Sequence, residues 1–496
     1  MPKITVVVYV LLVIFGTADV RADEKSDSDL PARAATHHTI ALGNNRLDYE
    51  AVAETLPVTD AKGATIASIF TVSYVADGKV GSDRPVSFVF NGGPGAASVF
   101  LHLGALGPRI LETPANGDVP SPPVRLVDNP ATWLRFTDLV FVDPVGTGFS
   151  RGKGKEDNPD KPFWDVRADI ASLGTVVRLW LTRHQRWTSP VYLVGESYGG
   201  FRAAAMTQSL PHDVGVIVKG LVLVSPALDL SALHQTERDL LAAAFVLPSY
   251  AATAAAYATL PPAHDLGEVE RFALSDYLVG LADLKGQPSP GDPFIAKVAD
   301  YVGVPAEIVR RYRGRVPRHV FAREVRRSQG EVVSVYDSLI ARPAGPEDSE
   351  NSSDPVLQPA VAAYGTAFNA YVAETLGVHT DLPYRVLARN VSQQWNWQGE
   401  REHGSDGLAL SSLEKALLEH PKMRLLIVNG RHDLVTPYFA SRWLVDQLEI
   451  PAAMRSEIQL RVYEGGHMVY MRPQSRILMA RDAADLYGTG AGSPTQ

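Results

Sequence analysis

The sequence predicts an α/β fold with a mostly parallel central sheet, helices on both of its faces and a helical insertion. Short, continuous apolar runs at residues 85–90, 139–142 and 191–194 are typical of strands that are buried on both faces. An amphipathic helical pattern at residues 164–182 lies between such runs, and strands that alternate with helices form parallel sheets. Residues 228–385 instead carry apolar residues at helical spacing, which indicates the insertion.

The composition is that of an ordinary globular protein. The chain has 496 residues, of which 45% are hydrophobic and 21% are charged. We expect a signal peptide (1–22), a first part of the α/β core (23–227), a helical insertion or cap (228–385), a second part of the core (386–487) and a disordered tail (488–496). The net charge of −8 and the lack of a basic run give no indication of a nucleic-acid partner.

The N-terminus has the pattern of a secretory signal peptide. Lys3 supplies a positive start, residues 4–15 form an almost wholly apolar run, and small residues permit cleavage after Ala22. The run is short for a membrane span, and an uncleaved anchor is the alternative. We therefore expect a secreted or periplasmic protein with no membrane span after signal removal, beginning with a flexible segment at residues 23–36.

The chain contains no cysteine, which excludes thiolate catalysis, Cys-based metal sites and disulfides. No His-Glu-x-x-His pattern indicates a metal either, so we expect neither a metal nor a cofactor. An exported chain without disulfides must be stabilised by its core, which its size allows. Such a composition favours a bacterial source.

Local patterns predict the remaining elements. Residues 46–58 and 64–75 alternate and are rich in β-branched residues, so they are expected to pair as antiparallel strands. Residues 98–106 are expected to be helical, and the proline-rich residues 111–130 to form an extended surface excursion. Further helices are expected at residues 231–246, with Ser231 as N-cap, and at 268–283 and 356–376, and further strands at 220–225, 424–428 and 459–463.

Gly195-Glu-Ser-Tyr-Gly199 lies between a predicted strand and a segment rich in helix-forming residues. A Gly-x-Ser-x-Gly pattern in this setting indicates a nucleophile elbow, which lifts the Ser197 hydroxyl clear of the sheet edge. A Cβ at either glycine would clash with the neighbouring strand and helix, and the following helix directs its positive N-terminal end at the site. The alternative is an ordinary glycine-rich turn.

A serine nucleophile needs a base, and the base needs an orienting carboxylate. Asp433 and His467 follow two successive late strands, which gives the chain order Ser, Asp, His that is expected of α/β-hydrolases. We predict Ser197 as nucleophile, His467 as general base and then acid, and Asp433 as the group that fixes the His467 tautomer. His432 is a competing base, and the alternative for Asp433 is a helix N-cap.

An oxyanion hole needs preorganised N–H donors. The Tyr198 amide, directly after the nucleophile, is one expected donor. The second is expected from the loop after an early strand, where the glycines of Asn91-Gly-Gly-Pro-Gly95 let the backbone approach a substrate closely. We choose Gly93 for this role.

Several motifs together resemble those of the serine carboxypeptidases. They are Asn91-Gly-Gly-Pro-Gly95, Asp143-Pro-Val-Gly-Thr-Gly-Phe-Ser150, Gly195-Glu-Ser-Tyr-Gly199 and Gly466-His-Met468, with Asn129-Pro130 and Trp133 in support. The resemblance covers most of residues 85–230 and 385–475, whereas the insertion is matched only in position. It implies an α/β-hydrolase fold and the removal of single residues from the C-terminus of peptide substrates through an acyl-enzyme.

The resemblance also implies a site for the terminal carboxylate of the substrate. In that family, the Asn and first Gly of the loop and the Glu before the nucleophile form this site, and the matching residues here are Asn91, Gly92 and Glu196. A carboxylate can hydrogen-bond Glu196 only while Glu196 is protonated, which predicts activity favoured at acidic pH. The alternative is a strand-end acid without a substrate role.

Two positions depart from the family pattern. Ala105 stands where the family usually has a second Glu, so we expect weakened carboxylate capture at neutral pH or a relaxed preference for a free C-terminus. His102, one helical turn earlier, is a candidate substitute, and a core or surface histidine is the alternative. Ala96 stands where many relatives have a disulfide cysteine, so the insertion must be held by packing alone.

Other functions stay open from the sequence. One is an esterase or an acyltransferase on the same scaffold, and another is a catalytically silent binding protein. Gln394-Trp-Asn-Trp397 is expected to provide aromatic packing where the chain re-enters the core, with lining of the substrate cleft as the alternative.

Overall fold

A ten-stranded sheet forms the centre of the protein. In the computed structural model, which describes residues 33–78, 83–233, 239–258, 264–284, 288–345, 354–397 and 408–489, the strand order is β1-β2-β3-β7-β4-β9-β10-β13-β14, with β8 paired to β3. The strands are β1 (Arg33–Leu42), β2 (Asn45–Thr59), β3 (Thr65–Ala76), β4 (Val86–Phe90), β7 (Asp138–Val142), β8 (Arg151–Gly152), β9 (Val191–Glu196), β10 (Val218–Val224), β13 (Arg424–Gly430) and β14 (Ile458–Tyr463). The predicted signal peptide lies outside the described residues, as do residues 490–496 of the predicted tail.

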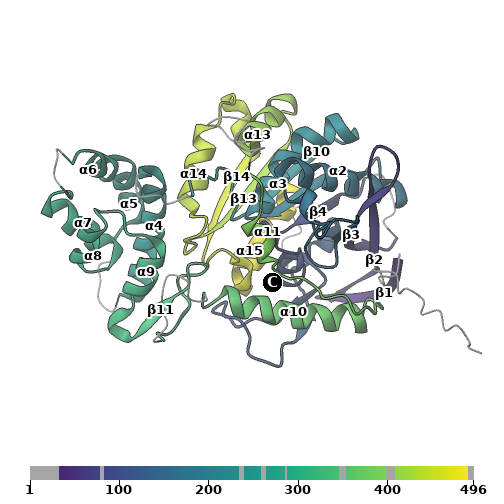
Figure 1. The fold of residues 1–496 in the computed structure, drawn as a ribbon, viewed down its shortest axis with the longest axis horizontal. Coiled ribbons are helices and arrows are strands. Elements are labelled where there is room, and N and C mark those ends of the chain that lie inside the picture. Colours follow the sequence, from purple (N-terminus) through teal and green to yellow (C-terminus); the bar gives the residue numbers. More distant parts are fainter. Residues whose placement is uncertain are drawn as a thin grey trace, which may run out of the picture.

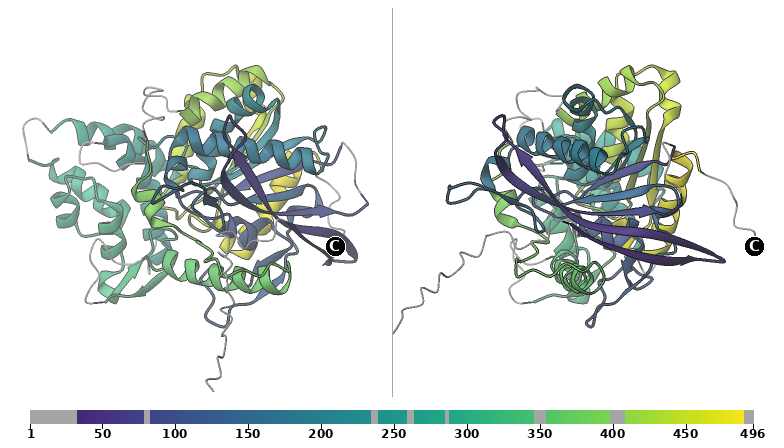
Figure 2. Two further views of the ribbon diagram at one scale, coloured as in Figure 1. Left: turned by 45° about the vertical axis from the view of Figure 1, so that its right-hand side comes forward. Right: turned by 90° about the vertical axis from the view of Figure 1, so that its right-hand side faces the viewer.

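The six neighbouring strands β7, β4, β9, β10, β13 and β14 are parallel to one another. At the other side of the sheet, β1, β2, β3 and β7 pair as antiparallel neighbours. β2 and β3 confirm the predicted antiparallel pair at residues 46–58 and 64–75. Figure 2 shows these long strands at one side of the twisted sheet. The inner parallel strands β7, β4 and β9 are short buried runs, as expected for strands that helices cover on both faces, whereas the edge strand β14 is only partly buried.

Helices cover both faces of the sheet, which confirms the predicted fold class. Along β10, Leu221 and Leu223 belong to one core, and Val222 and Val224 belong to the other, because successive side chains point to opposite faces. The first core includes α2 (Val166–Arg183), α3 (Tyr198–Ser209) and α13 (Leu408–Glu419), and the second includes α1 (Val99–Leu101), η1 (His102–Leu106), α10 (Leu357–Glu374) and α15 (Pro473–Leu486).

Helices α4 to α9 form a lobe with a core of its own, beside α14 (Figure 1). They are α4 (Leu240–Tyr257), α5 (Leu266–Phe272), α6 (Leu278–Ala282), α7 (Asp292–Val302), α8 (Ala306–Arg311) and α9 (Arg318–Glu324), and α14 (Tyr438–Gln447) contributes residues to the same core. By length and composition α4 could cross a membrane, but 67% of it is buried in the structure, which favours a core helix.

The start predicted for the first helix of this lobe is wrong. The helix expected at residues 231–246 begins at Leu240, where Asp239 is the N-cap and accepts a hydrogen bond from the Ala242 amide. Ser231 lies in a turn before this helix, where its hydroxyl and its amide both donate to Asp229 Oδ1. The insertion also contains an unexpected hairpin of β11 (Glu331–Val333) and β12 (Ala341–Pro343).

One further prediction is wrong outside the lobe: residues 33–36, predicted as part of a flexible segment, begin β1, which pairs with the long β2 over ten residues. The proline-rich residues 111–130 form a largely exposed excursion, as predicted, and a short pair of strands, β5 (Arg109–Leu111) and β6 (Leu126–Asp128), bounds it. In both places a neighbouring strand supplies the backbone hydrogen bonds that local composition does not reveal.

Candidate active site

Ser197 occupies a strained turn between β9 and α3. Its φ of 58° and ψ of −124° lie in a region that residues with a side chain rarely adopt, and such strain is typical of a nucleophile elbow. The Ser197 carbonyl accepts hydrogen bonds from the amides of Gly200 and Ala227, and its own amide donates to Val224. These bonds fix the turn, and Ser197 remains partly exposed.

The glycines of the elbow are required by close packing, as predicted. A Cβ on Gly195 would overlap the Gly199 carbonyl oxygen, and a Cβ on Gly199 would overlap the Phe90 carbonyl oxygen. Gly92 meets the elbow from the other side, because a Cβ there would lie 2.5 Å from the Tyr198 nitrogen. The loop after β4 and the elbow are therefore in direct contact.

Asp433 and His467 form a buried pair at the ends of β13 and β14. His467 Nδ1 lies 2.8 Å from Asp433 Oδ2, and the two residues are 4% and 0% exposed. Burial lowers the pKa of His467, but the charge of Asp433 and the hydrogen bond outweigh it and raise the pKa above 6.5. Burial raises the pKa of Asp433, but His467 and Thr436 outweigh it, so Asp433 is held as a carboxylate.

Thr436 contacts both members of the Asp433–His467 pair, although no sequence motif indicated it. Its hydroxyl donates to Asp433 Oδ2 at 2.6 Å, lies 3.0 Å from His467 Nδ1 and lies 3.0 Å from the Ser225 carbonyl oxygen. A hydroxyl has a single hydrogen, and the charged carboxylate is its closest acceptor. The single Nδ1–H of His467 faces the same carboxylate at 2.8 Å, which leaves Nε2 as the basic atom.

Ser225 connects the nucleophile to the other two residues. Its hydroxyl donates to the His467 carbonyl at 2.8 Å, and it lies in the segment after β10 that includes Ala227, the donor to Ser197. Among the hydrogen bonds of the described residues, none joins Ser197 Oγ to His467. Catalytic hydrogen bonds are commonly long or poorly aligned before substrate binds.

His432, the competing base, lies in different surroundings. Its Nδ1 is 3.3 Å from Thr253 Oγ1 and its Nε2 is 3.4 Å from Glu464, so both ring nitrogens face groups outside the proposed triad. The predicted role of His467 is therefore the one that the geometry favours. His467 also contacts the insertion, because its amide donates to the Tyr336 carbonyl at 2.5 Å and its ring meets the Tyr336 ring edge-on.

Glu196 and Asn91 are joined by a hydrogen bond beside Ser197. Asn91 Nδ2 donates to Glu196 Oε2 at 2.7 Å, and Asn91 Oδ1 accepts from the Leu101 amide. Burial, reinforced by Asp433, raises the pKa of Glu196 to about 7, although His467, Tyr470 and Asn91 act in the opposite direction. Glu196 is thus neutral in mildly acidic solution and can then donate a hydrogen bond.

Arg202 of α3 fixes the loop that carries Asn91. Its Nη1 donates to the Asn91 carbonyl at 2.6 Å, and its Nε donates to Asp169 Oδ2 of α2 at 2.6 Å. Both charged groups of this ion pair are buried. The loop is therefore tied to the two helices that cover this face of the sheet.

His102 does not take the place of the missing Glu. Its Nε2 lies 2.7 Å from the Tyr74 hydroxyl, and its ring stacks on Phe141 with centroids 4.1 Å apart. Burial lowers its pKa to about 3, so it is neutral. The structure supports the alternative that His102 is a core histidine.

The proposed oxyanion donors lie where the loop and the elbow meet. Gly93 has a φ of 102° and is exposed, and Tyr198 begins α3. The Tyr198 ring stacks on Phe201, and Trp395 and Trp397 each meet it edge-on at 5.4 Å between centroids. These contacts agree with the predicted role of residues 394–397 in aromatic packing.

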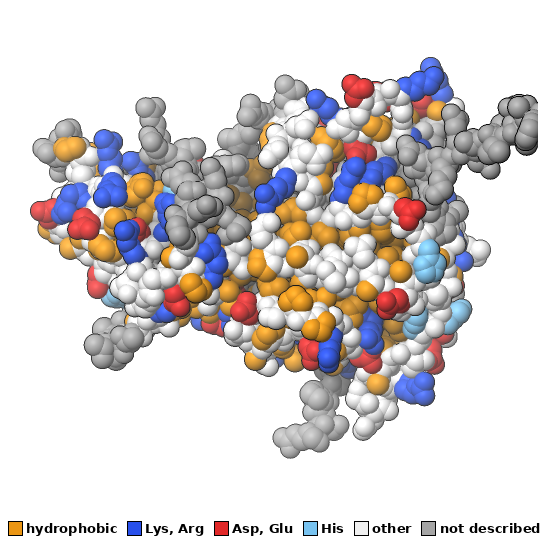
Figure 3. All heavy atoms as spheres, turned by 60° about the horizontal axis from the view of Figure 1, so that its bottom comes forward, with side chains coloured by type: hydrophobic (Ala, Val, Ile, Leu, Met, Phe, Trp, Pro, Cys, Tyr) orange, Lys and Arg blue, Asp and Glu red, His pale blue; other side chains and the backbone are white. Residues whose placement is uncertain are grey.

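Two surface hollows lie near these elements. One, of about 550 Å³, is lined by Val361 of α10 and by residues 384–390, which bond to the loop at Gly95 and Ala97. Figure 3 shows the face that carries α10, where hydrophobic side chains gather in the middle and Lys and Arg side chains lie around them.

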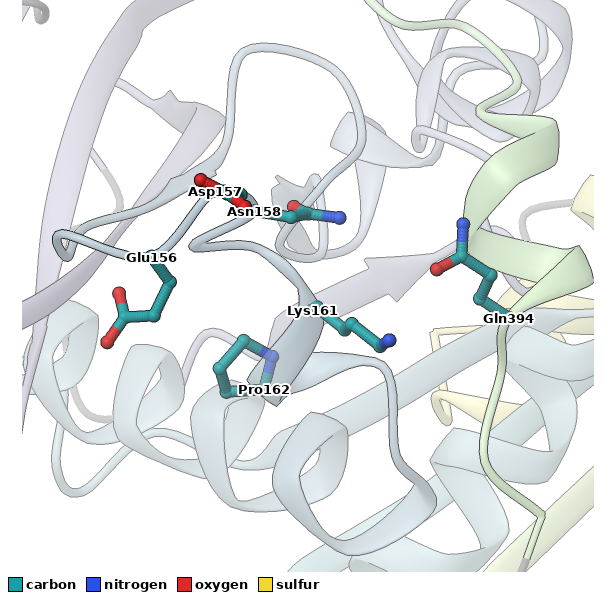
Figure 4. Close-up of a pocket in the computed structure, with 6 residues that line it drawn as sticks. All are labelled: Glu156, Asp157, Asn158, Lys161, Pro162 and Gln394. Carbon is teal, nitrogen blue, oxygen red and sulfur yellow. The ribbon is translucent and has the colours of Figure 1, made fainter.

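The second hollow has a volume of about 470 Å³ and is lined by Glu156, Asp157, Asn158, Lys161, Pro162 and Gln394. In Figure 4, Lys161 extends toward Gln394 and the Glu156 carboxylate lies on the opposite side. Ser197, Asp433 and His467 line neither hollow. The candidate site therefore rests on the hydrogen-bonded residues at the strand ends and not on the shape of the surface.

The strand order and the loops after β9, β13 and β14 define an α/β-hydrolase fold. Residues 67–242 match the family model Peptidase_S10, which describes the serine carboxypeptidases. This match includes Asn91, Glu196 and Ser197 and ends before Asp433 and His467.

Curated proteins of Arabidopsis thaliana are similar to part of the chain. Serine carboxypeptidase-like 13 is 28% identical over 163 residues, and serine carboxypeptidase-like 16 is 31% identical over 157 residues. These alignments cover 32% and 29% of this chain and 35% and 34% of the relatives, so the chain spans about a third of their length. These relatives are plant proteins and give no support to a bacterial source.

Two solved hydrolases are similar to this chain over most of its length. The peroxisomal α/β-hydrolase Lpx1 from Saccharomyces cerevisiae is 11% identical with a TM-score of 0.36. The match covers 94% of this chain and 91% of the Lpx1 chain. A 2-hydroxy-6-oxo-6-phenylhexa-2,4-dienoate hydrolase from Rhodococcus is 13% identical with a TM-score of 0.36, covering 91% and 100%. The fold assignment rests on the strand order of the chain itself.

Proposed function

We propose that this protein is a serine carboxypeptidase, which removes residues from the C-terminus of peptides through an acyl-enzyme. The observation that carries the proposal is the hydrogen bond between Asn91 and Glu196, directly before the nucleophile Ser197. A buried acid whose pKa is about 7 can bind the terminal carboxylate of a peptide, which a general esterase does not need. The match of residues 67–242 to the serine carboxypeptidases supports the same function.

The proposed reaction begins when Ser197 Oγ attacks the carbonyl carbon of the last peptide bond and its proton passes to His467 Nε2. The amides of Gly93 and Tyr198 donate hydrogen bonds to the oxyanion. The C–N bond then breaks, and His467 gives the proton to the departing amino group. Water then attacks the acyl carbon while His467 takes its proton. The bond to Ser197 Oγ breaks, His467 returns the proton to that oxygen, and a peptide that is one residue shorter leaves.

Digestion of a peptide library, followed by mass spectrometry, tests the proposal. We expect stepwise loss of C-terminal residues for peptides with a free carboxylate, at a rate that falls as the pH rises above about 7 and Glu196 ionises. The same peptides with a C-terminal amide should be cleaved more slowly, and the Ser197→Ala variant should cleave neither. Internal cleavage, or equal cleavage of acids and amides at every pH, would contradict the proposal.

An acyl-transfer enzyme with another substrate, such as an esterase or an acyltransferase, is the second candidate. Ala105 favours it, because the second acid of the family pattern is missing and capture of a carboxylate depends on Glu196. Comparison of simple esters with free-acid peptides separates the two functions. A strong preference for the esters would support the second candidate.

We further propose that the protein is exported and acts on peptides outside the cytoplasm. The apolar run at residues 4–15 and the small residues before the predicted cleavage site after Ala22 support export. The absence of cysteine supports a bacterial source of this secreted form. N-terminal sequencing of the protein from the culture medium or periplasm tests both cleavage and location.

A further inference from the structure

Tyr470 contacts the proposed carboxylate-binding acid directly. It lies in η9 (Val469–Met471), three residues after the base His467, and it is fully buried. Its hydroxyl donates to Glu196 Oε2 at 2.7 Å, and the same oxygen accepts from Asn91 Nδ2 at 2.7 Å. No sequence motif indicated this contact.

The ring of Tyr470 packs directly against Gly104 of η1. A Cβ on Gly104 would lie 2.6 Å from Tyr470 Cε2 and 2.5 Å from the Tyr364 hydroxyl. Gly104 precedes Ala105, the position where the family pattern has the second acid. The small side chains of η1 and the phenol of η9 are therefore complementary, and a larger residue at 104 could not accompany Tyr470.

The hydrogen bonds at Glu196 determine which of its oxygens can carry a proton. Burial and the nearby Glu196 carboxyl raise the pKa of Tyr470 well above 10, so the phenol keeps the hydrogen that it donates to Glu196 Oε2. Asn91 can offer only its Nδ2–H because Oδ1 is occupied by the Leu101 amide. Glu196 Oε2 therefore accepts from both neighbours, and the acidic hydrogen of Glu196 belongs on Oε1.

We propose that Tyr470 is a positioning residue of the carboxylate-binding site: its phenol replaces the missing second acid, holds Glu196 Oε2 and leaves Oε1–H for a substrate carboxylate. The inference rests on the proposed function and adds a specificity-determining residue to it. A neutral phenol differs from a second acid because it cannot share a proton with Glu196 and adds no charge.

Other titratable groups also act on Glu196. They are His467 after β14, Asp433 after β13, Tyr336 in the β11–β12 loop and Tyr364 in α10. Protonated His467 lowers the pKa of Glu196 and ionised Asp433 raises it, whereas the buried tyrosines stay neutral. A test of Tyr470 must leave these groups in place, which a Tyr→Phe substitution does.

Tyr470→Phe, compared with Tyr364→Phe, tests the proposal in the full-length protein. Tyr364 is a matched control because it is also buried against Gly104, but its hydroxyl bonds to Met471 Sδ and not to Glu196. Without the phenol, ionised Glu196 loses a donor, so the high-pH limit of kcat/KM for free-acid peptides should move up by about one pH unit. The profile for amidated peptides should not move, and Tyr364→Phe should leave both limits where they are.

An unchanged high-pH limit in Tyr470→Phe, or equal changes with acids and amides, would overturn the proposal. A readout without turnover separates this result from failure of the proposed function. In the Ser197→Ala background, N-acetylphenylalanine should raise Tm and its amide should not, and Tyr470→Phe should extend the effect of the acid to higher pH. If these Tm shifts occur but the wild type cleaves no peptide, the proposed peptidase function is refuted and the proposed role of Tyr470 stands. If the acid and the amide shift Tm equally, the proposed role of Tyr470 is refuted.

Discussion

Replacement of Glu196 by Gln should make the protein more stable in neutral solution. Glu196 is 3% exposed, and burial raises its pKa from 4.5 to about 7. A carboxyl group with a higher pKa in the folded protein binds its proton more tightly there than in the unfolded chain. The folded state therefore loses stability as the pH rises from about 4.5 to about 7, where Glu196 becomes a buried charge.

The size of the effect follows from the two pKa values. A tenfold change in a binding constant corresponds to about 1.4 kcal/mol, so the difference between 4.5 and about 7 corresponds to about 3 kcal/mol. Gln has the shape of the protonated acid, and its carbonyl can accept from Asn91 and Tyr470 while its NH₂ replaces the hydroxyl. Glu196→Gln should thus gain about 3 kcal/mol above pH 7 and nothing below pH 4.5.

Urea unfolding of wild type and Glu196→Gln between pH 4 and pH 8.5 measures this difference. Glu449→Gln is the control because Glu449 is exposed, and its effect should be small at every pH. A stability difference for Glu196→Gln that does not depend on pH would refute the reasoning. It would mean that Glu196 titrates as an ordinary carboxyl in the folded protein.

Three further predictions concern the site. Thr436→Val removes the donor to Asp433 Oδ2, so labelling of Ser197 by a fluorophosphonate should slow about tenfold, and an unchanged rate would exclude Thr436 from the machinery. Gly195→Ala places a methyl group on the Gly199 carbonyl oxygen, so it should destabilise the protein by about 3 kcal/mol in urea unfolding; a loss below 0.5 kcal/mol would mean that the elbow can relax. kcat/KM for free-acid peptides should fall at low pH as His467 is protonated and at high pH as Glu196 ionises near pH 7, and a profile without the second fall would contradict carboxylate capture.

The sequence was sufficient for the parts of the fold and site that depend on local pattern. The apolar runs predicted buried strands, and the elbow glycines and the chain order of Ser197, Asp433 and His467 placed three candidate residues on neighbouring strand ends. Such residues are found because a parallel sheet brings the ends of its strands to one edge.

Residues that act through long-range contacts could not be found in this way. Thr436 has a weak local signal, since it follows Asp433 by three residues in a turn, but Tyr470 reaches Glu196 across 274 residues. The strand β1 was missed because its partner, β2, and not its composition determines its conformation. In η1 the sequence showed only that the second Glu of the family pattern is missing at Ala105. The structure shows that the Tyr470 ring packs against the neighbouring Gly104.

The hydrogen bond from the His467 amide to the Tyr336 carbonyl crosses the boundary between the catalytic core and the insertion. The main chain of His467 is therefore bonded to Tyr336 of the insertion, and its ring packs edge-on against the Tyr336 ring. A displacement of the β11–β12 loop away from the core would have to break this hydrogen bond. The placement of the imidazole thus depends on the insertion as well as on the strand ends.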